Sequence, residues 1–149
     1  MNYKEYMVKV SENGDIRWFK PGTDIVHREG GPAAEFAIKN KLWYIDGKLH
    51  RLDGTACEYN NGDTAWFFEG KRHRLCGPAQ ETNGNKFWYK DGQAHREDGP
   101  AFEYANGDKY WYFEGKELTE EQFNNRNKLS CEGKVVEIDG VKYKLTEIK

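Results

Sequence analysis

The chain of 149 residues repeats one short unit along most of its length, and this repetition constrains its fold more than any other feature. All five tryptophans belong to one series with a spacing of 22 to 25 residues: Trp18, Trp43, Trp66, Trp88 and Trp111. All four histidines belong to a second series with a similar spacing: His27, His50, His73 and His95. Such a period is typical of arrays in which each repeat is one supersecondary unit packed against its neighbours.

The sequences around the two series indicate that the repeat is a β-hairpin. Aromatic arms (WYIDGK, WFFEGK, WYKDGQ, WYFEGK) alternate with loops of the form HR-x-DGPA, at 27–33, 50–56, 73–79 and 95–101. Asn-Gly pairs connect the units, at 13–14, 61–62, 83–84 and 106–107, and Asn-Gly between strands favours a type I′ turn. We predict an all-β fold, an elongated antiparallel repeat sheet of about five hairpins, with every His-Arg pair along one edge.

Different patterns flank the repeats, which occupy residues 13–116. Residues 1–12 contain an alternating apolar segment, which predicts an N-terminal strand. In residues 117–149, Thr119-Glu120-Glu121-Gln122 is a capping box, so we expect a short helix over about 119–127 that caps the last repeat. Two further apolar segments flank Asp139-Gly140 and predict a terminal hairpin.

Composition excludes several classes of protein. The 23 basic and 25 acidic residues nearly balance, whereas a protein that neutralises nucleic-acid phosphates is normally basic. No apolar run is long enough to span a membrane, and the N-terminus lacks the apolar stretch of a secretory leader. Three widely spaced cysteines suit reduced thiols, so we expect a cytoplasmic protein. Aromatic residues reach 15%, which predicts a thin, aromatic-rich core.

The repeat resembles the MORN repeat, a β-hairpin unit that carries a Gly-x-x-His element. The matching segments are Gly47-Lys48-Leu49-His50, Gly70-Lys71-Arg72-His73 and Gly92-Gln93-Ala94-His95. MORN repeats usually have glycine directly after the histidine, whereas arginine follows it here. The chain is more similar to the HR-x-DGPA variant found in bacteriophage and giant-virus proteins. The resemblance covers residues 13–116 and implies a binding surface without catalysis or cofactor, in a phage-encoded protein acting in the host cytoplasm.

The histidines allow two interpretations. The row of four imidazoles at one sheet edge could hold metal or act as general bases, and His50, His73 and His95 are also candidates for contact with a ligand or partner. Because two strands separate equivalent residues, neighbouring histidines lie roughly 9 to 10 Å apart, too far to share one ion. We therefore predict no metal site, and expect each imidazole to close its own loop through a hydrogen bond to backbone.

The motif arginines also have two interpretations. Arg51, Arg74 and Arg96 could grip the phosphates or carboxylates of a ligand. Alternatively, each arginine pairs with the glutamate seven residues later, because the offset is constant. The expected pairs of this structural Arg–Glu ladder are Arg28–Glu35, Arg51–Glu58, Arg74–Glu81 and Arg96–Glu103.

The function expected from these features is binding without catalysis, since the sequence carries no familiar catalytic motif. The candidate surface combines the His-Arg edge with the rings of Trp43, Trp66, Trp88 and Trp111, because exposed aromatic patches often contact partners. The leading hypothesis is a protein-interaction module that acts on a host or defence component. The alternatives are a sequestrator of a nucleotide or other phosphorylated small molecule, and a weak hydrolase that uses the His-Arg edge. Open sheet edges would also allow a homodimer.

Overall fold

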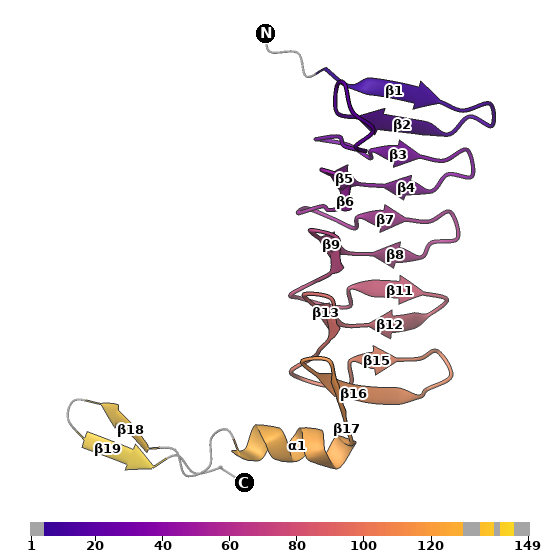
Figure 1. Ribbon diagram of the computed structural model, residues 1–149. Coiled ribbons are helices and arrows are strands. Elements are labelled where there is room, and N and C mark those ends of the chain that lie inside the picture. Colours follow the sequence, from indigo (N-terminus) through magenta and orange to yellow (C-terminus); the bar gives the residue numbers. More distant parts are fainter. Residues whose placement is uncertain (1–4, 130–134, 139–140, 145–149) are drawn as a thin grey trace.

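The computed structural model describes residues 5–129, 135–138 and 141–144, and it confirms an antiparallel repeat sheet (Figure 1). Eleven strands follow one another in the sheet in chain order, and the sheet does not close. They are β1 (Met7–Val10), β2 (Ile16–Phe19), β3 (Ala34–Glu35), β4 (Lys41–Leu42), β7 (Cys57–Glu58), β8 (Thr64–Ala65), β11 (Gln80–Thr82), β12 (Asn85–Phe87), β15 (Phe102–Glu103), β16 (Lys109–Phe113) and β17 (Lys116–Leu118). The expected N-terminal strand is β1, whose exposed Val8 and Val10 lie at one sheet edge.

A second row of small hairpins lies beside the sheet, and the sequence pattern did not predict it. These hairpins pair β5 (Tyr44–Ile45) with β6 (Lys48–Leu49), β9 (Phe67–Phe68) with β10 (Lys71–Arg72), and β13 (Tyr89–Lys90) with β14 (Gln93–Ala94). Each turn has an acidic residue and a glycine that both adopt positive φ, as at Glu69 (48°) and Gly70 (80°). The glycine N–H donates to the preceding hairpin, Gly70 to the carbonyl of Leu49 at 2.9 Å, so the row forms a continuous stack.

The type I′ prediction is correct at one Asn-Gly pair and wrong at three. Asn83 (φ 48°) and Gly84 (φ 78°) form a two-residue turn. At 13–14, 61–62 and 106–107 only the glycine has positive φ. There the asparagine side chain accepts the N–H of an aspartate two residues later, Asp63 to Asn61 at 3.1 Å, and this Asx turn keeps the asparagine at negative φ.

Alanine, rather than the expected aromatic residues, fills the centre of the sheet. The motif alanines have no exposed surface: Ala33, Ala56, Ala79 and Ala101. The first three each lie between two hydrogen-bonded neighbours, as where the Ala79 carbonyl accepts from Trp66 N–H at 2.7 Å and its N–H donates to the Phe87 carbonyl at 2.8 Å. Trp18, Trp43, Trp66 and Trp88 are half-buried, and a motif arginine covers one face of each ring.

The C-terminal end of the array carries a capping helix, α1 (Glu120–Leu129). The capping box forms as predicted, because Thr119 N–H donates to Oε1 of Gln122 at 2.9 Å and Gln122 N–H donates to Oγ1 of Thr119 at 3.1 Å. The terminal hairpin is β18 (Val135–Ile138) paired with β19 (Val141–Lys144). No helix in the described ranges is both long and apolar enough to cross a membrane.

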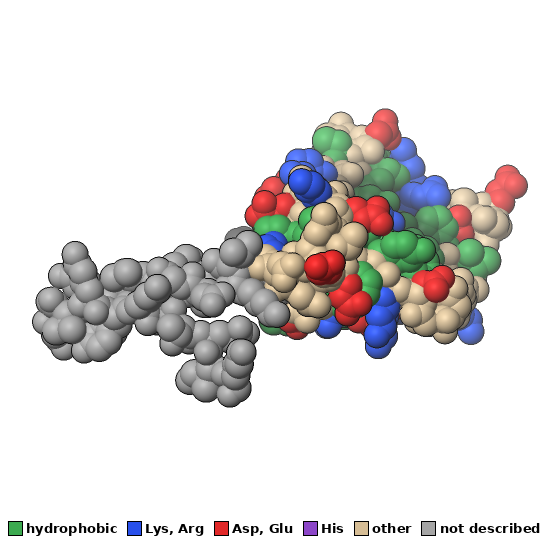
Figure 2. Space-filling view, turned by 90° about the horizontal axis from the view of Figure 1, so that it is seen from below, with side chains coloured by type: hydrophobic (Ala, Val, Ile, Leu, Met, Phe, Trp, Pro, Cys, Tyr) green, Lys and Arg blue, Asp and Glu red, His purple; other side chains and the backbone are tan. Residues whose placement is uncertain are grey.

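Aromatic rings cluster in the last repeats, next to α1. Phe102 contacts Phe87, Tyr89 and Tyr112, with ring centroids 4.7 to 5.7 Å apart. Figure 2 views the molecule from this end and shows hydrophobic side chains exposed among acidic and basic ones. The rings therefore supply apolar contact where the alanine column alone buries little area.

Candidate functional site

Three grooves lie between successive His-Arg loops, which comprise residues 27–31, 50–54, 73–77 and 95–99. The first groove has a volume of about 390 Å³, the central groove about 550 Å³ and the third about 500 Å³. Each is lined by one tryptophan, one histidine and the arginines of both adjacent loops. These residues are Arg28, Trp43, His50 and Arg51 in the first; Arg51, Trp66, His73 and Arg74 in the central; and Arg74, Trp88, His95 and Arg96 in the third.

Each motif arginine stacks on the tryptophan of its own repeat. The guanidinium carbon lies 4.0 Å from the ring centroid for Arg28 on Trp18, 4.1 Å for Arg51 on Trp43, 4.4 Å for Arg74 on Trp66 and 3.9 Å for Arg96 on Trp88. Nη1 also donates to the carbonyl four residues later, which is Pro78 at 3.0 Å in the third loop. The motif glycine leaves room for the guanidinium, because a Cβ at Gly54 would lie 2.7 Å from Cζ of Arg51. The arginine therefore closes its own loop.

Three of the four expected Arg–Glu contacts are present. Nη1 lies 3.4 Å from Oε1 for Arg28–Glu35, 2.9 Å for Arg51–Glu58 and 2.6 Å for Arg96–Glu103. In two loops an aspartate binds the same guanidinium, Asp53 to Nε of Arg51 at 3.0 Å and Asp98 to Nε of Arg96 at 2.7 Å. These hydrogen bonds hold the pKa of each aspartate below its ordinary value.

The third loop departs from this pattern. Within the described part of the chain, no ion pair joins Arg74 to Glu81 or to any other carboxylate, so this expected pair is wrong. Cys76 stands where the second and fourth loops have aspartate. Gly77 adopts a φ of +99°, unlike the corresponding glycines of the other loops, so the chain approaches Glu81 by a different path.

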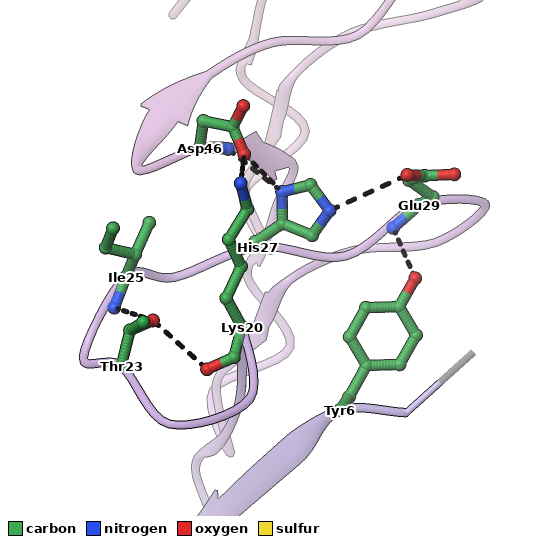
Figure 3. A network of polar contacts seen from close by, with 7 residues as sticks. All are labelled: Tyr6, Lys20, Thr23, Ile25, His27, Glu29 and Asp46. Carbon is green, nitrogen blue, oxygen red and sulfur yellow. Dashed lines mark hydrogen bonds and ion pairs between the residues drawn. The ribbon is translucent and has the colours of Figure 1, made fainter.

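The motif histidines bind backbone, though not in their own loops as expected. Nδ1 accepts an N–H from the next turn that pairs an acidic residue with glycine: Asp46 at 3.0 Å for His27, Glu69 at 3.2 Å for His50, Asp91 at 3.1 Å for His73 and, in the turn between β16 and β17, Glu114 at 3.1 Å for His95. Figure 3 shows the first copy, in which Lys20 also pairs with Asp46 and the Tyr6 hydroxyl accepts the N–H of Glu29. Nδ1 therefore joins one repeat to the next, while Nε2 faces the glutamate of its own loop in two copies, Glu29 at 3.8 Å from His27 and Glu97 at 3.4 Å from His95.

The predicted arginines and histidines and three of the four predicted tryptophans line the grooves, whereas Trp111 and the ladder glutamates Glu35, Glu58, Glu81 and Glu103 do not. Trp111 lines a separate cleft with Leu118 and the start of α1. Glu81 is exposed and lies between Lys86 and Thr64 in the register of the sheet.

Two leucines in the central loops were not selected by the sequence analysis. Leu52 is 76% exposed and Leu75 is 79% exposed, and the first and fourth loops have Glu29 and Glu97 at this position. Phe68, 40% exposed, lies between the two central histidines, with ring centroids 4.9 Å from His50 and 6.0 Å from His73. The sequence did contain a signal for these residues, because leucine replaces the glutamate of this loop position in the two central loops only.

The two described cysteines have opposite environments. Cys57 is buried, and burial raises the pKa of its thiol to about 11. Cys76 is exposed and lines both the central and third grooves. Cys131 lies outside the described residues.

Iodoacetamide at neutral pH should modify Cys76 readily and leave Cys57 unmodified while the protein is folded, because only a thiolate that solvent can reach attacks the reagent. Peptide mapping by mass spectrometry after timed quenching separates the three cysteines. Denaturation in urea before labelling should abolish the difference. Equal labelling of Cys57 and Cys76 in the folded protein would contradict the buried position of Cys57.

Within the described ranges, no group of three or more His, Cys, Asp and Glu side chains could hold a metal ion. The arrangement instead offers a series of grooves whose charged side chains are largely paired within the protein. The resemblance to MORN repeats stays a prediction. No protein-family model, curated protein or solved structure matches the chain.

Proposed function

We propose that the chain is a non-enzymatic protein-binding module and that its contact surface is the central groove. The supporting observation is the placement of Leu52, Leu75 and Phe68, three exposed apolar side chains, around the largest of the three His-Arg grooves. Exposed apolar side chains gathered around a concavity and flanked by charged loops are typical of protein contact sites. A host or defence component, as expected from the family resemblance, would be a partner of this kind.

Sequestration of a nucleotide or phosphorylated small molecule receives less support. It needs guanidinium donors and ring faces that are free to hold phosphate and base. Arg51 and Arg96 instead donate to two carboxylates and a carbonyl each, and both cover one face of a tryptophan.

A hydrolase that uses the His-Arg edge also receives less support. A general base needs a ring nitrogen directed at substrate or water. Nδ1 of every motif histidine accepts a backbone N–H, and His95 is itself buried.

The central groove can be tested by giving its loops the sequence of the outer loops. Peptides are first selected on the wild-type protein from a display library of random peptides, and their affinities are measured by fluorescence anisotropy. The double variant Leu52→Glu/Leu75→Glu should then bind at least about tenfold less tightly, since each leucine contributes about 1 kcal/mol of buried contact.

The control variant is Ile38→Glu, which changes an exposed aliphatic residue in a turn at the opposite edge of the sheet. Its affinity for the same peptides should equal that of the wild type. Unchanged peptide affinity in the double variant would show that binding occurs elsewhere and would refute the proposal.

A further inference from the structure

We infer that the partner of the central groove is an acidic, apolar segment of another protein, whose carboxylate pairs with Arg74 while its apolar side chain packs between Leu52 and Leu75. This inference rests on the proposed function and adds to it the chemistry of the partner.

Arg74 differs from the other motif arginines in its charge balance. Arg28, Arg51 and Arg96 each contact at least one carboxylate in the structure. Among the described residues, Arg74 is the one motif arginine that contacts none: Cys76 replaces the loop aspartate, and no ion pair joins Arg74 to Glu81. Its side chain makes the stack on Trp66 and one hydrogen bond, to the carbonyl of Pro78 at 3.0 Å.

The surroundings of Arg74 match a single carboxylate better than other charged groups. Arg74 lines both the central and third grooves, next to Leu75 and Cys76. The other arginine of the central groove, Arg51, is already neutralised by Asp53 and Glu58. One unpaired guanidinium therefore remains, and its planar fork suits a carboxylate.

A phosphate monoester fits less well, because it carries about −1.5 to −2 charges and needs several free donors. Besides its two arginines, the groove is lined by apolar and aromatic side chains, Cys76, His73 and Asp91, whose Oδ1 lies 2.9 Å from Nδ1 of His73, and by no further lysine or arginine. Apolar walls beside one cation select a segment that presents both an acidic and an apolar side chain. The occupant is thus a protein segment with Asp or Glu close to a leucine-like or aromatic residue.

The other repeats suggest a test variant, Cys76→Asp. It places an aspartate two residues after Arg74, as in the second and fourth loops. The new aspartate should pair with Arg74 and occupy it, as Asp53 occupies Arg51 at 3.0 Å. We expect the affinity for peptides selected on the wild type to fall at least tenfold, while the urea midpoint stays equal or rises. Cys76→Ser, which adds no charge, should retain wild-type affinity.

The selected peptides provide the second half of the test. We expect them to be enriched in an acidic residue near an apolar one. Changing that acidic residue to its amide should weaken binding at least tenfold to the wild type and less than twofold to Cys76→Asp and Arg74→Gln. Arg28→Gln is the matched control, because Arg28 stacks on Trp18 in the same way but does not line the central groove.

The outcomes separate the inference from the proposed function. If the double leucine variant loses binding but Cys76→Asp binds normally, the groove binds protein and the carboxylate inference fails. If neither variant changes binding, or if no peptide can be selected, both the carboxylate inference and the proposed function are wrong. Displacement of the peptides by millimolar AMP, with loss of AMP binding in Arg74→Gln, would also overturn the inference, in favour of a phosphate ligand.

Discussion

Leucine in place of Ala79 should lower the free energy of unfolding by about 3 kcal/mol, the upper part of the usual range for overpacking. Ala79 has no exposed surface, and its backbone bonds to Trp66 on one side and Phe87 on the other. Additional carbon atoms can be accommodated only if these hydrogen-bonded neighbours separate. Urea unfolding followed by tryptophan fluorescence measures the effect, because all five tryptophans lie in the repeat array.

Ala37→Leu provides the comparison for this substitution. Ala37 belongs to an exposed turn, so the same added volume meets solvent there and should change the free energy of unfolding by less than about 0.5 kcal/mol. Similar losses in both variants would mean that the alanine column does not set the spacing of the strands. A larger loss at Ala79, with an unchanged fold of the outer repeats, would fit the nearest-neighbour energetics of repeat arrays.

The architecture could be predicted because repetition encodes it many times. The Trp and His series place each hairpin, and the capping box places the helix, whose start at Glu120 lies within one residue of the prediction. The small hairpins were missed because, within the repeats, turns were predicted at the Asn-Gly pairs and none at the Asp-Gly or Glu-Gly pairs that end the aromatic arms. In the structure Asp46 and Gly47 adopt φ values of 53° and 73°, so this pair forms a two-residue turn of its own.

The site could be predicted only as far as each repeat obeys the common pattern. The seven-residue offset correctly identifies contacts such as Arg51–Glu58, because the same loop geometry recurs. At Arg74 it fails, because Gly77 alone among the motif glycines adopts positive φ at its position. The aromatic share of the sequence suggested a ring-filled core, but the indole faces are covered by guanidinium groups and alanine fills the centre. The proposed function therefore rests on departures from the repeat, such as Leu52 and Cys76, which the common pattern does not predict.

Removal of the arginine side chain should be far more costly in the fourth loop than in the third. The Arg96 side chain donates to Asp98 at 2.7 Å, to Glu103 at 2.6 Å and to the Pro100 carbonyl at 3.1 Å, whereas the Arg74 side chain donates one hydrogen bond, to the Pro78 carbonyl. Hydrogen bonds to charged groups contribute about 1.5 kcal/mol or more each. We therefore expect Arg96→Ala to lower the free energy of unfolding by about 3 kcal/mol and Arg74→Ala by about 1 kcal/mol, both measured by urea unfolding.

Substitution of the carboxylates that lose their partner in Arg96→Ala tests whether ion pairs cause this difference in stability. Glu103, 34% exposed, loses its cation in Arg96→Ala, so Glu103→Gln in that background should restore part of the lost stability. In the Arg74→Ala background, Glu81→Gln should restore nothing, because Glu81 makes no ion pair with Arg74. Equal losses for the two arginines would show that the stack on tryptophan, common to both, outweighs the ion pairs. A side chain that contributes little to folding is free to contact a partner. The small loss of stability expected for Arg74→Ala therefore agrees with the position of Arg74 in the central groove.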